Sequence, residues 1–371
     1  MISSPYLTLI NPLWTSELRG VIETVTPVSE SAVAITIRTN GAWTGHEAGQ
    51  FVTVGVEVNG VRHHRCYSLT SVPRPASRSD RSRNDRASRR LEIAVQRVED
   101  GLVSAHLTSA AKPGDLLFLS EAAGDFTLPA GLRGTAPTQL LFVSGGSGIT
   151  PLMGMIRTLA ERSERPGRGH AASVRLVHYA PTPERTMFRD ELTTLAARHD
   201  WLDVEIVHTR VPGNDAALTH LTHLDAESLE RHCPDWRGRE AYICGPIGLI
   251  EFATDHWAEH HLLDRLHVER FTSALTTRPQ QSAVDDGPGA ATFTRSSIVT
   301  ESASPDRTLL EVAEDAGVLA PFGCRQGVCH TCSTKLLSGC TRDVRTGQLS
   351  EPGTHVQLCI STAVGDVALD L

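Results

Sequence analysis

The 371-residue chain has few aromatic residues, no excess of positive charge and no disulfide framework. Aromatic residues make up 5% of the sequence and hydrophobic residues 40%, a composition typical of soluble globular proteins. The net charge of −8 argues against nucleic acid as the main partner. Four of the eight cysteines, Cys66, Cys233, Cys244 and Cys340, are scattered, and the opening Met-Ile-Ser-Ser-Pro lacks a basic region followed by an apolar run. We therefore expect a cytoplasmic protein without a secretory signal.

One uncharged stretch, 135–156, is long enough to cross a bilayer. Its centre is Val143-Ser-Gly-Gly-Ser-Gly148, which is too flexible and too polar for a lipid-facing helix. We expect a strand, a loop and a helix there, and no transmembrane segment.

The remaining four cysteines have an informative spacing. Cys324, Cys329 and Cys332 follow one another closely, and Cys359 comes after a further 26 residues. This is the plant-type arrangement of four thiolates around a 2Fe–2S cluster. Zinc sites more often use two short Cys-x-x-Cys pairs, and buried structural cysteines are a second alternative. The spacing favours the cluster, and hence a protein that moves single electrons.

The length predicts two or three domains. Short apolar runs separated by turns, between about 18 and 130, predict an antiparallel β-barrel or sandwich. Strands alternating with helices, between about 136 and 273, predict a doubly wound parallel sheet. Beyond them, a capping box at Thr308–Glu311 predicts a helix over 309–316, and a short apolar strand is expected at 367–371. These last elements indicate a small α+β domain.

Two polar segments interrupt this order. Residues 275–291 are rich in proline and glycine, which predicts a flexible tether. The stretch 74–90 holds seven arginines between two strand-like runs. We interpret it as an inserted solvated loop, with a docking surface for an acidic partner or an anionic lipid as the alternative.

Four further segments suit cofactor binding. Arg65-Cys-Tyr67-Ser68 offers a cation for phosphate, a ring for stacking and a hydroxyl for a ring nitrogen, just after a predicted strand. Gly101-Leu-Val-Ser104 could donate to a pyrophosphate at a helix start, although an ordinary turn and N-cap is the alternative. Gly145–Gly148 follows an apolar strand and opens a helix, which favours a dinucleotide loop although the spacing is not Gly-x-Gly-x-x-Gly; a plain strand-to-helix turn is the alternative. Cys244-Gly245-Pro246 ends a strand, where ligands bind in open α/β sheets.

In this order, the motifs resemble the ferredoxin–NADP reductase superfamily fused to a C-terminal plant-type ferredoxin. The resemblance covers residues 18–371, and within the superfamily the chain looks most similar to actinobacterial reductases that supply fatty-acid desaturases. It implies an antiparallel β-barrel flavin domain, a doubly wound nicotinamide-binding domain and a β-grasp ferredoxin domain. The implied boundaries are an extension at 1–17, the flavin domain at 18–133, the nicotinamide domain at 134–273, a linker at 274–291 and the ferredoxin domain at 292–371.

The resemblance also assigns site residues. The flavin would be held by Arg65, Tyr67 and Ser68, and its pyrophosphate by Gly101, Val103 and Ser104. The nicotinamide dinucleotide would be seated by Gly145, Gly146, Gly148, Thr150 and Pro151, beside Cys244, Gly245 and Pro246. Glu269 and Phe271 match the segment that closes over the flavin in oxygenase-type reductases. The implied catalytic set is Tyr67, Ser68, Thr150, Cys244 and Glu269.

The implied activity is electron transfer from NAD(P)H through FAD to the 2Fe–2S cluster and on to a protein partner. FAD is favoured over FMN because Gly-x-x-Ser suits a pyrophosphate. Arg185 and Arg210 favour NADPH as readers of its 2′-phosphate, with NADH as the alternative. The expected acceptor is a membrane di-iron desaturase, with a cytochrome monooxygenase or a ring-hydroxylating oxygenase second. A redox sensor without enzyme activity is the alternative from another class.

Overall fold

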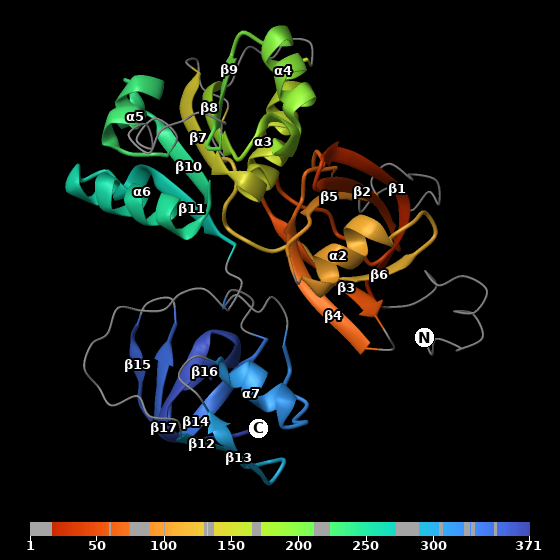
Figure 1. The fold of residues 1–371 in the computed structure, drawn as a ribbon, viewed down its shortest axis with the longest axis vertical. Coiled ribbons are helices and arrows are strands. Elements are labelled where there is room, and N and C mark those ends of the chain that lie inside the picture. The colour runs from red at the N-terminus through yellow and green to blue at the C-terminus, as the bar shows by residue number, and fades with distance from the viewer. Residues whose placement is uncertain are drawn as a thin grey trace. The chain divides into compact units, whose positions relative to one another are not determined.

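The structure is a computed structural model that describes residues 17–58, 61–74, 89–99, 101–129, 132, 137–164, 172–210, 223–271, 289–303, 307–322, 327, 331–344 and 347–371. The chain divides into two compact units, Met1–Phe271 and Thr272–Leu371 (Figure 1). Over the ranges described, no helix combines the length and apolarity needed to span a membrane. From Thr138 to Ile156, the uncharged stretch forms a strand, a 3₁₀ turn and the first turns of a helix, as predicted.

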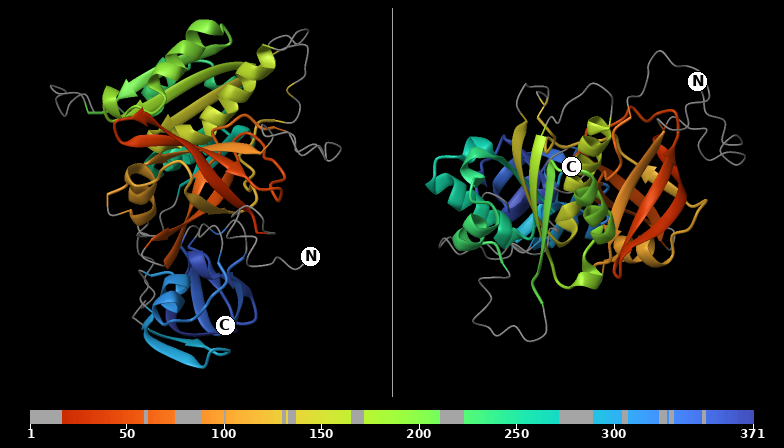
Figure 2. Two further views of the ribbon diagram at one scale, coloured as in Figure 1. Left: turned by 90° about the vertical axis from the view of Figure 1, so that its right-hand side faces the viewer. Right: turned by 90° about the horizontal axis from the view of Figure 1, so that it is seen from above.

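The first unit opens with a six-stranded antiparallel sheet in the order β4-β3-β6-β1-β2-β5. Its elements are β1 (Arg19–Ser29), β2 (Ala32–Thr39), β3 (Phe51–Val58), β4 (Val61–Ser68), β5 (Arg90–Gln96), α2 (Leu102–Ser109) and β6 (Leu116–Leu119). A bridge between Leu69 and Ile93 links the two ends of this path. Inward-facing side chains such as Ile35, Val52 and Leu91 fill the interior. The sheet therefore closes as a barrel, as predicted, and Figure 2 shows its strands wrapping around this core.

One strand of the barrel differs from the prediction. Arg65–Ser68 was expected just after a strand, but it forms the end of β4, which pairs with β3 from Val58↔Val61 to Phe51↔Ser68. The sequence Val-Arg-His-His-Arg-Cys-Tyr-Ser has no apolar alternation, because much of its side-chain surface is polar. Pairing with the buried strand β3, rather than local pattern, fixes β4 in the sheet.

The rest of the first unit is a five-stranded parallel sheet in the order β11-β10-β7-β8-β9. Its strands are β7 (Thr138–Gly145), β8 (Ala172–Ala180), β9 (Leu202–His208), β10 (Glu240–Gly245) and β11 (Leu266–Arg270). Its helices are α3 (Ile149–Ser163), α4 (Arg189–Arg198), α5 (Ala226–His232) and α6 (Ile247–Glu259). Separate apolar clusters join α3 and α4 to one face and α5 and α6 to the other, so the sheet is doubly wound as predicted (Figure 2).

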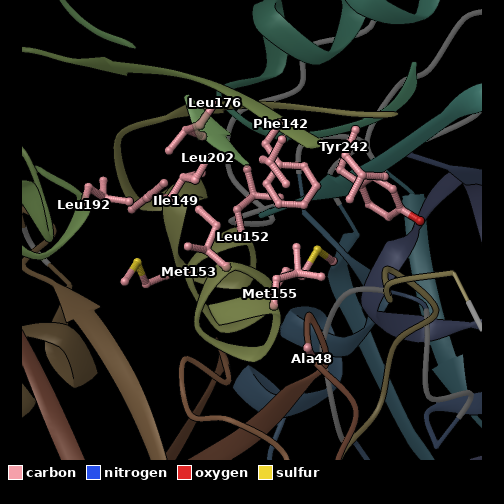
Figure 3. Packing of buried hydrophobic residues seen from close by; sticks show 14 of the residues in the cluster. Ala48, Phe142, Ile149, Leu152, Met153, Met155, Leu176, Leu192, Leu202 and Tyr242 are labelled. Carbon is pink, nitrogen blue, oxygen red and sulfur yellow. The ribbon is translucent and has the colours of Figure 1, made fainter. Parts of the chain in front are cut away.

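The barrel and the parallel sheet share part of their core. Figure 3 shows Ile149, Leu152 and Met155 of α3 between Phe142 of the sheet and Ala48 of the barrel. Phe126 and Ala94, also from the barrel, belong to the same buried cluster. Because apolar burial contributes about 25 cal/mol per Å², this shared cluster stabilises one relative arrangement of the two halves.

The second unit contains a mixed sheet in the order β13-β12-β17-β14-β15, with β16 paired to β14. Its elements are β12 (Gly289–Phe293), β13 (Ile298–Ala303), α7 (Leu309–Asp315), β14 (Ser333–Asp343), β15 (Leu349–Ser350), β16 (His355–Gln357) and β17 (Ser361–Leu369). The predicted capping box is present, with Thr308 and Glu311 bonding each other's backbone N–H. The closing strand was predicted too short, since its N-terminal half is not continuously apolar.

The first strand of this unit begins at Gly289, inside the range predicted as linker. A Cβ atom on Gly289 would lie 2.1 Å from the Gly365 carbonyl oxygen. This glycine therefore allows close backbone approach in a sheet, although the proline- and glycine-rich composition of the segment 275–291 is typical of a tether. Several predicted segments lie outside the described residues: the extension at 1–16, residues 75–88 of the arginine-rich insertion, residues 274–288 of the predicted linker, and Cys324 and Cys329.

Candidate functional site

The glycine loop after β7 interlocks with the turn after β10. A Cβ on Gly148 would lie 2.1 Å from the Cys244 carbonyl oxygen, and one on Gly145 would lie 2.6 Å from Pro246 Cδ. Strands β7 and β10 are parallel neighbours, with β8 on the other side of β7, so the chain switches direction across the sheet here. Ligands of open α/β sheets bind at such a switch point. The structure thus brings together two segments that the sequence offered separately.

Helix α3 starts directly behind this loop. Gly146 has φ +55°, a left-handed conformation that side chains other than glycine adopt rarely. Thr150 and Pro151 lie in the first turn of the helix, and the Thr150 hydroxyl donates to the Ser147 carbonyl at 3.0 Å. The exposed N–H groups and the dipole of a helix start favour phosphate.

Two titratable groups lie side by side at the carboxyl edge of the sheet. Cys244 of β10 and Glu269 of β11 are register partners, and Cys244 is fully buried. Burial raises the pKa of the Glu269 carboxyl to about 8, and burial next to Glu269 raises the pKa of the Cys244 thiol. The buried Glu269 Oε2 has no hydrogen-bond partner among the described residues. Both groups are therefore mainly neutral at pH 7, and one of them has a polar atom available for a ligand.

The end of β4 supplies three of the predicted flavin-binding groups. Ser68 is buried, and its hydroxyl finds no hydrogen-bond partner in the described part of the chain. Tyr67 packs against the barrel core, and burial raises the pKa of its phenol. The Arg65 side chain is exposed. A buried hydroxyl without a partner is costly, so Ser68 fits a site completed by a ligand.

Helix α2 begins beside an open cleft of about 610 Å³, lined in part by Gly101, Leu102, Arg97 and Arg185. The Ser104 hydroxyl donates to the Gly101 carbonyl at 3.0 Å and accepts from the Val98 N–H at 3.2 Å. The Ser104 side chain is thus engaged in the turn that starts the helix, and Val103 points into the barrel core. The cleft is also lined by Glu99, and its two guanidinium groups, Arg97 and Arg185, would attract an anion such as a pyrophosphate.

The two arginines predicted to read the 2′-phosphate lie near adjacent strand ends. Arg210 follows β9, and its backbone N–H donates to the Pro181 carbonyl, which follows β8. Arg185 also follows β8, in a short 3₁₀ turn. Arg185 also lines the cleft at the start of α2, where the pyrophosphate of a flavin was expected. Phe271 ends the first unit and is 37% exposed.

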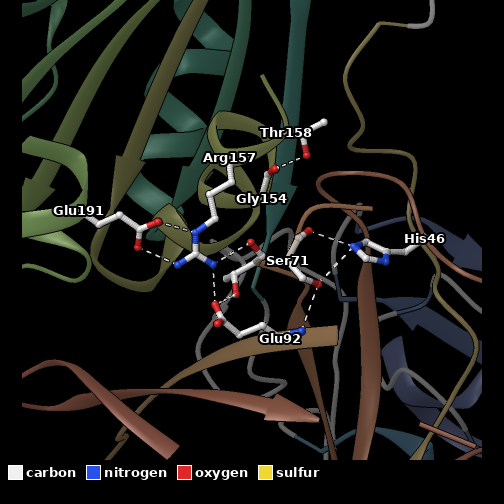
Figure 4. Close-up of polar contacts among 8 residues, drawn as sticks. His46, Ser71, Glu92, Gly154, Arg157, Thr158 and Glu191 are labelled. Atoms are coloured by element: carbon white, nitrogen blue, oxygen red, sulfur yellow. Dashed lines mark hydrogen bonds and ion pairs between the residues drawn. The ribbon is translucent and has the colours of Figure 1, made fainter. Parts of the chain in front are cut away.

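A polar contact that was not predicted from the sequence joins the two halves of this unit. Arg157 of α3 makes two 2.7 Å hydrogen bonds with Glu191 of α4, one of 2.5 Å with Glu92 of β5 and one of 2.9 Å with the Thr70 carbonyl (Figure 4). Its ion pairs raise the pKa of Arg157 despite its burial. Four strong hydrogen bonds to these partners restrict the distance and the orientation between α3 and the barrel.

Gly154 is the second group that sequence reasoning missed. A Cβ on this residue would lie 2.5 Å from the Leu69 carbonyl oxygen, directly after Ser68. The glycine lets α3 approach the barrel backbone closely. An isolated glycine inside a predicted helix was the signal that could have found it.

A buried histidine lies at the same sheet edge. His178 of β8 is fully buried, and its Nδ1 lies 2.8 Å from the Ser144 hydroxyl of β7. Burial lowers the pKa of His178 to about 4. The unfolded chain therefore binds this proton more readily than the folded chain between pH 6.5 and 4.

We expect this histidine to make the first unit acid-sensitive. Its contribution to stability is present above pH 6.5 and falls by about 2 kcal/mol between pH 7 and pH 5. Urea unfolding at both pH values, followed by tryptophan fluorescence, measures this loss, and His178→Gln should remove most of it. An equal loss in the variant would contradict the assignment.

In the second unit, two of the predicted cluster cysteines meet. Cys332 and Cys359 are buried, and their Sγ atoms lie 3.2 Å apart. The Gly327 N–H donates to Cys359 Sγ at 3.3 Å, and the hydrogen bond between the two thiols lowers the pKa of Cys332 to about 6. A thiolate-forming pair with an N–H donor to sulfur is the environment of an iron–sulfur ligand.

Two protein families match separate parts of the chain. The oxidoreductase NAD-binding domain family matches residues 142–255, and the 2Fe–2S iron–sulfur cluster binding domain family matches residues 292–363. These ranges contain the glycine loop with the Cys244 turn, and the cysteine pair, respectively.

Relatives and one solved structure cover between 87% and 100% of the chain. An NADPH oxidoreductase of Mycobacterium tuberculosis (strain ATCC 25618 / H37Rv) is 36% identical and covers 100% of this chain and 89% of its own length. The NADH oxidoreductase HCR of Escherichia coli (strain K12) is 29% identical over 87% of this chain and 88% of its own. The structure of phthalate dioxygenase reductase aligns with a TM-score of 0.63 at 27% identity, covering 95% of this chain and 97% of that one.

These matches agree with the closed barrel, the doubly wound sheet and the buried thiol pair. The predicted fold class is confirmed, as is an oxidoreductase with a nicotinamide-binding domain and a 2Fe–2S domain. The chain belongs to the ferredoxin–NADP reductase-type oxidoreductases that carry a C-terminal 2Fe–2S ferredoxin domain.

Proposed function

We propose that this chain takes electrons from NADPH, passes them through FAD to a 2Fe–2S cluster and delivers them singly to an oxygen-activating protein. The observation that carries the proposal is the interlocked edge where Gly145 and Gly148 meet Cys244 and Pro246. Next to it, Glu269 and Cys244 offer neutral polar groups, and the ends of β4 and α2 carry groups suited to a flavin.

The residues present fit these groups. Ser68, Tyr67 and Arg65 would hold the flavin ring and phosphate, the α2 start would hold its pyrophosphate, and the four cysteines would hold the cluster. When bound, the flavin exchanges electron pairs with the nicotinamide and single electrons with the cluster. The protein contributes orientation and an apolar setting: the glycines allow close approach, and a neutral Glu269 adds no negative charge beside the donor.

The acceptor is proposed by class. Phthalate dioxygenase reductase is, by its name, the reductase of an oxygenase, which supports an oxygenase-type partner. Our narrower proposal, a fatty-acid desaturase, depends on the resemblance of the sequence alone. Steady-state turnover of each candidate partner by the purified reductase and NADPH distinguishes the two.

Stopped-flow reduction by NADPH and NADH in parallel, followed at flavin and cluster wavelengths, tests the proposed electron path. We expect flavin bleaching first and cluster bleaching second, with NADPH faster than NADH. Cluster reduction without prior flavin reduction, or no reduction by either nucleotide, would overturn the proposal.

Glu269 provides a pH test. With a pKa of about 8, it is protonated below pH 8 and able to donate a hydrogen bond, and it loses that ability above pH 8. We expect the rate of flavin reduction to fall above pH 8 in the natural protein and to stay level in Glu269→Gln. Glu269→Ala should lose about tenfold at pH 7, as expected for one hydrogen bond in a buried site. If the rate of flavin reduction still falls above pH 8 in Glu269→Gln, a group other than Glu269 causes the pH dependence.

The two arginines can be separated experimentally. We predict that both read the 2′-phosphate, so that Arg210→Ala and Arg185→Ala each reduce the preference for NADPH over NADH about tenfold or more. Because Arg185 also lines the α2 cleft, Arg185→Ala should in addition weaken FAD retention. Kinetic constants for both nucleotides and the flavin content after gel filtration measure the two effects. An unchanged preference in both variants would contradict NADPH as the donor on these grounds.

A further inference from the structure

Histidines gather at the C-terminal end of α6, on the side of the parallel sheet covered by α5 and α6. His256 lies in the last turn, Glu259 is the last helical residue and His260 caps the helix. One ligand atom from each of these three side chains lies within 4.8 Å of the others. Spacings of three and four residues place side chains on one helix face, as metal-binding helices require.

The hydrogen bonds determine which histidine nitrogens are available. His260 Nδ1 lies 2.9 Å from the His256 carbonyl oxygen and therefore donates to it, which leaves the lone pair on Nε2. This Nε2 accepts from Arg237 Nη2 at 3.3 Å. His256 Nε2 is buried and, within the described ranges, has no hydrogen-bond partner. Such an orphaned nitrogen is the second sign of a missing ligand.

The surroundings hold the His256 ring in place. Its ring stacks on Phe252 at 5.2 Å between centroids and lies 5.0 Å from Trp236. The helix C-terminus itself favours a cation.

We propose that His256, Glu259 and His260 form a binding site for a borderline divalent transition-metal ion of the Zn²⁺ class. Two neutral imidazoles and one carboxylate are three common zinc ligands, and solvent would complete a tetrahedron. Bound through Nε2, the ion would give His256 the partner it lacks. Arg237 disfavours binding of the ion, because the ion must displace the hydrogen bond from Arg237 to His260 and is repelled by the guanidinium charge. Glu230, which pairs with Arg237, can keep that guanidinium aside.

Isothermal titration of Zn²⁺ into the tag-free, cofactor-loaded protein tests the site. We expect His260→Ala and His256→Phe, which keeps the aromatic stacking, each to weaken one binding event by at least tenfold. Arg237→Gln should strengthen the same event because it frees His260 Nε2. His261→Asn is the matched control: this exposed histidine has φ +58°, which asparagine tolerates, and its replacement should leave binding unchanged.

A second measurement identifies the ligands without reference to activity. With the cluster oxidised, the EPR spectrum of added Cu²⁺ should show coupling to two nitrogens in the natural protein and to one in His260→Ala. Equal Zn²⁺ affinity in the natural protein and both histidine variants would overturn the proposal, as would an unchanged Cu²⁺ spectrum.

Discussion

Replacement of Cys359 by serine is expected to remove the 2Fe–2S absorption and to lower cytochrome c reduction at least about tenfold, while ferricyanide reduction stays near normal. Serine is a poor ligand for iron because its hydroxyl deprotonates far less readily than a thiol. The buried contact with Cys332 and the N–H donor from Gly327 make Cys359 part of an ordered sulfur pair. Ferricyanide, a small oxidant, can collect electrons before they reach the cluster.

Cys340→Ser is the matched control for this experiment. Cys340 lies in β14 of the same unit, partly buried, in a register pair with Val364 of β17. Its replacement should leave the iron content and both activities unchanged. Normal iron content in Cys359→Ser, or equal losses in both variants, would contradict the ligand assignment.

The sequence predicted the parts of this site that need special backbone. Gly145 and Gly148 can be recognised in the sequence because only glycine permits the contacts that they make with Cys244 and Pro246. The predicted cluster ligands can be recognised from the cysteine spacing because a 2Fe–2S cluster requires a fixed geometry of its ligands. The order of three domains followed from a change in periodicity from two residues to strand–helix alternation.

Features that depend on pairing across the chain were not predictable. Strand β4 has no apolar alternation and is fixed by β3. Gly289 was assigned to a tether because the local composition is rich in proline and glycine, and its contact with the distant Gly365 leaves no mark on that composition. Arg157 stands in an unremarkable helix, and its partners Glu92 and Thr70 come from the other half of the unit. Long-range contacts of this kind leave no local pattern.

Arg157→Met is expected to destabilise the first unit by roughly 3 kcal/mol and to slow hydride transfer. The substitution keeps the aliphatic stem but leaves Glu92 and Glu191 without their shared cation, and breaking a partly buried ion pair costs this much. Arg198→Met is the control, because its pair with Glu164 is exposed on both sides and should contribute less than about 1 kcal/mol. Urea unfolding compares the two variants. Equal losses would show that burial at Arg157 does not matter.

The kinetic effect has a separate cause. Arg157 connects α3, which begins at the glycine loop, to Glu92 and Thr70 of the barrel. Thr70 lies two residues beyond Ser68 in the chain. A displacement of about 1 Å between donor and acceptor can cost about a hundredfold in rate. The variant Arg157→Met/Glu92→Gln/Glu191→Gln removes the unpaired charges, so most of the stability should return. Single-turnover flavin reduction should stay slow, since the directional hydrogen bonds are still missing. Recovery of both stability and rate would mean that the network stabilises the unit without orienting its two halves.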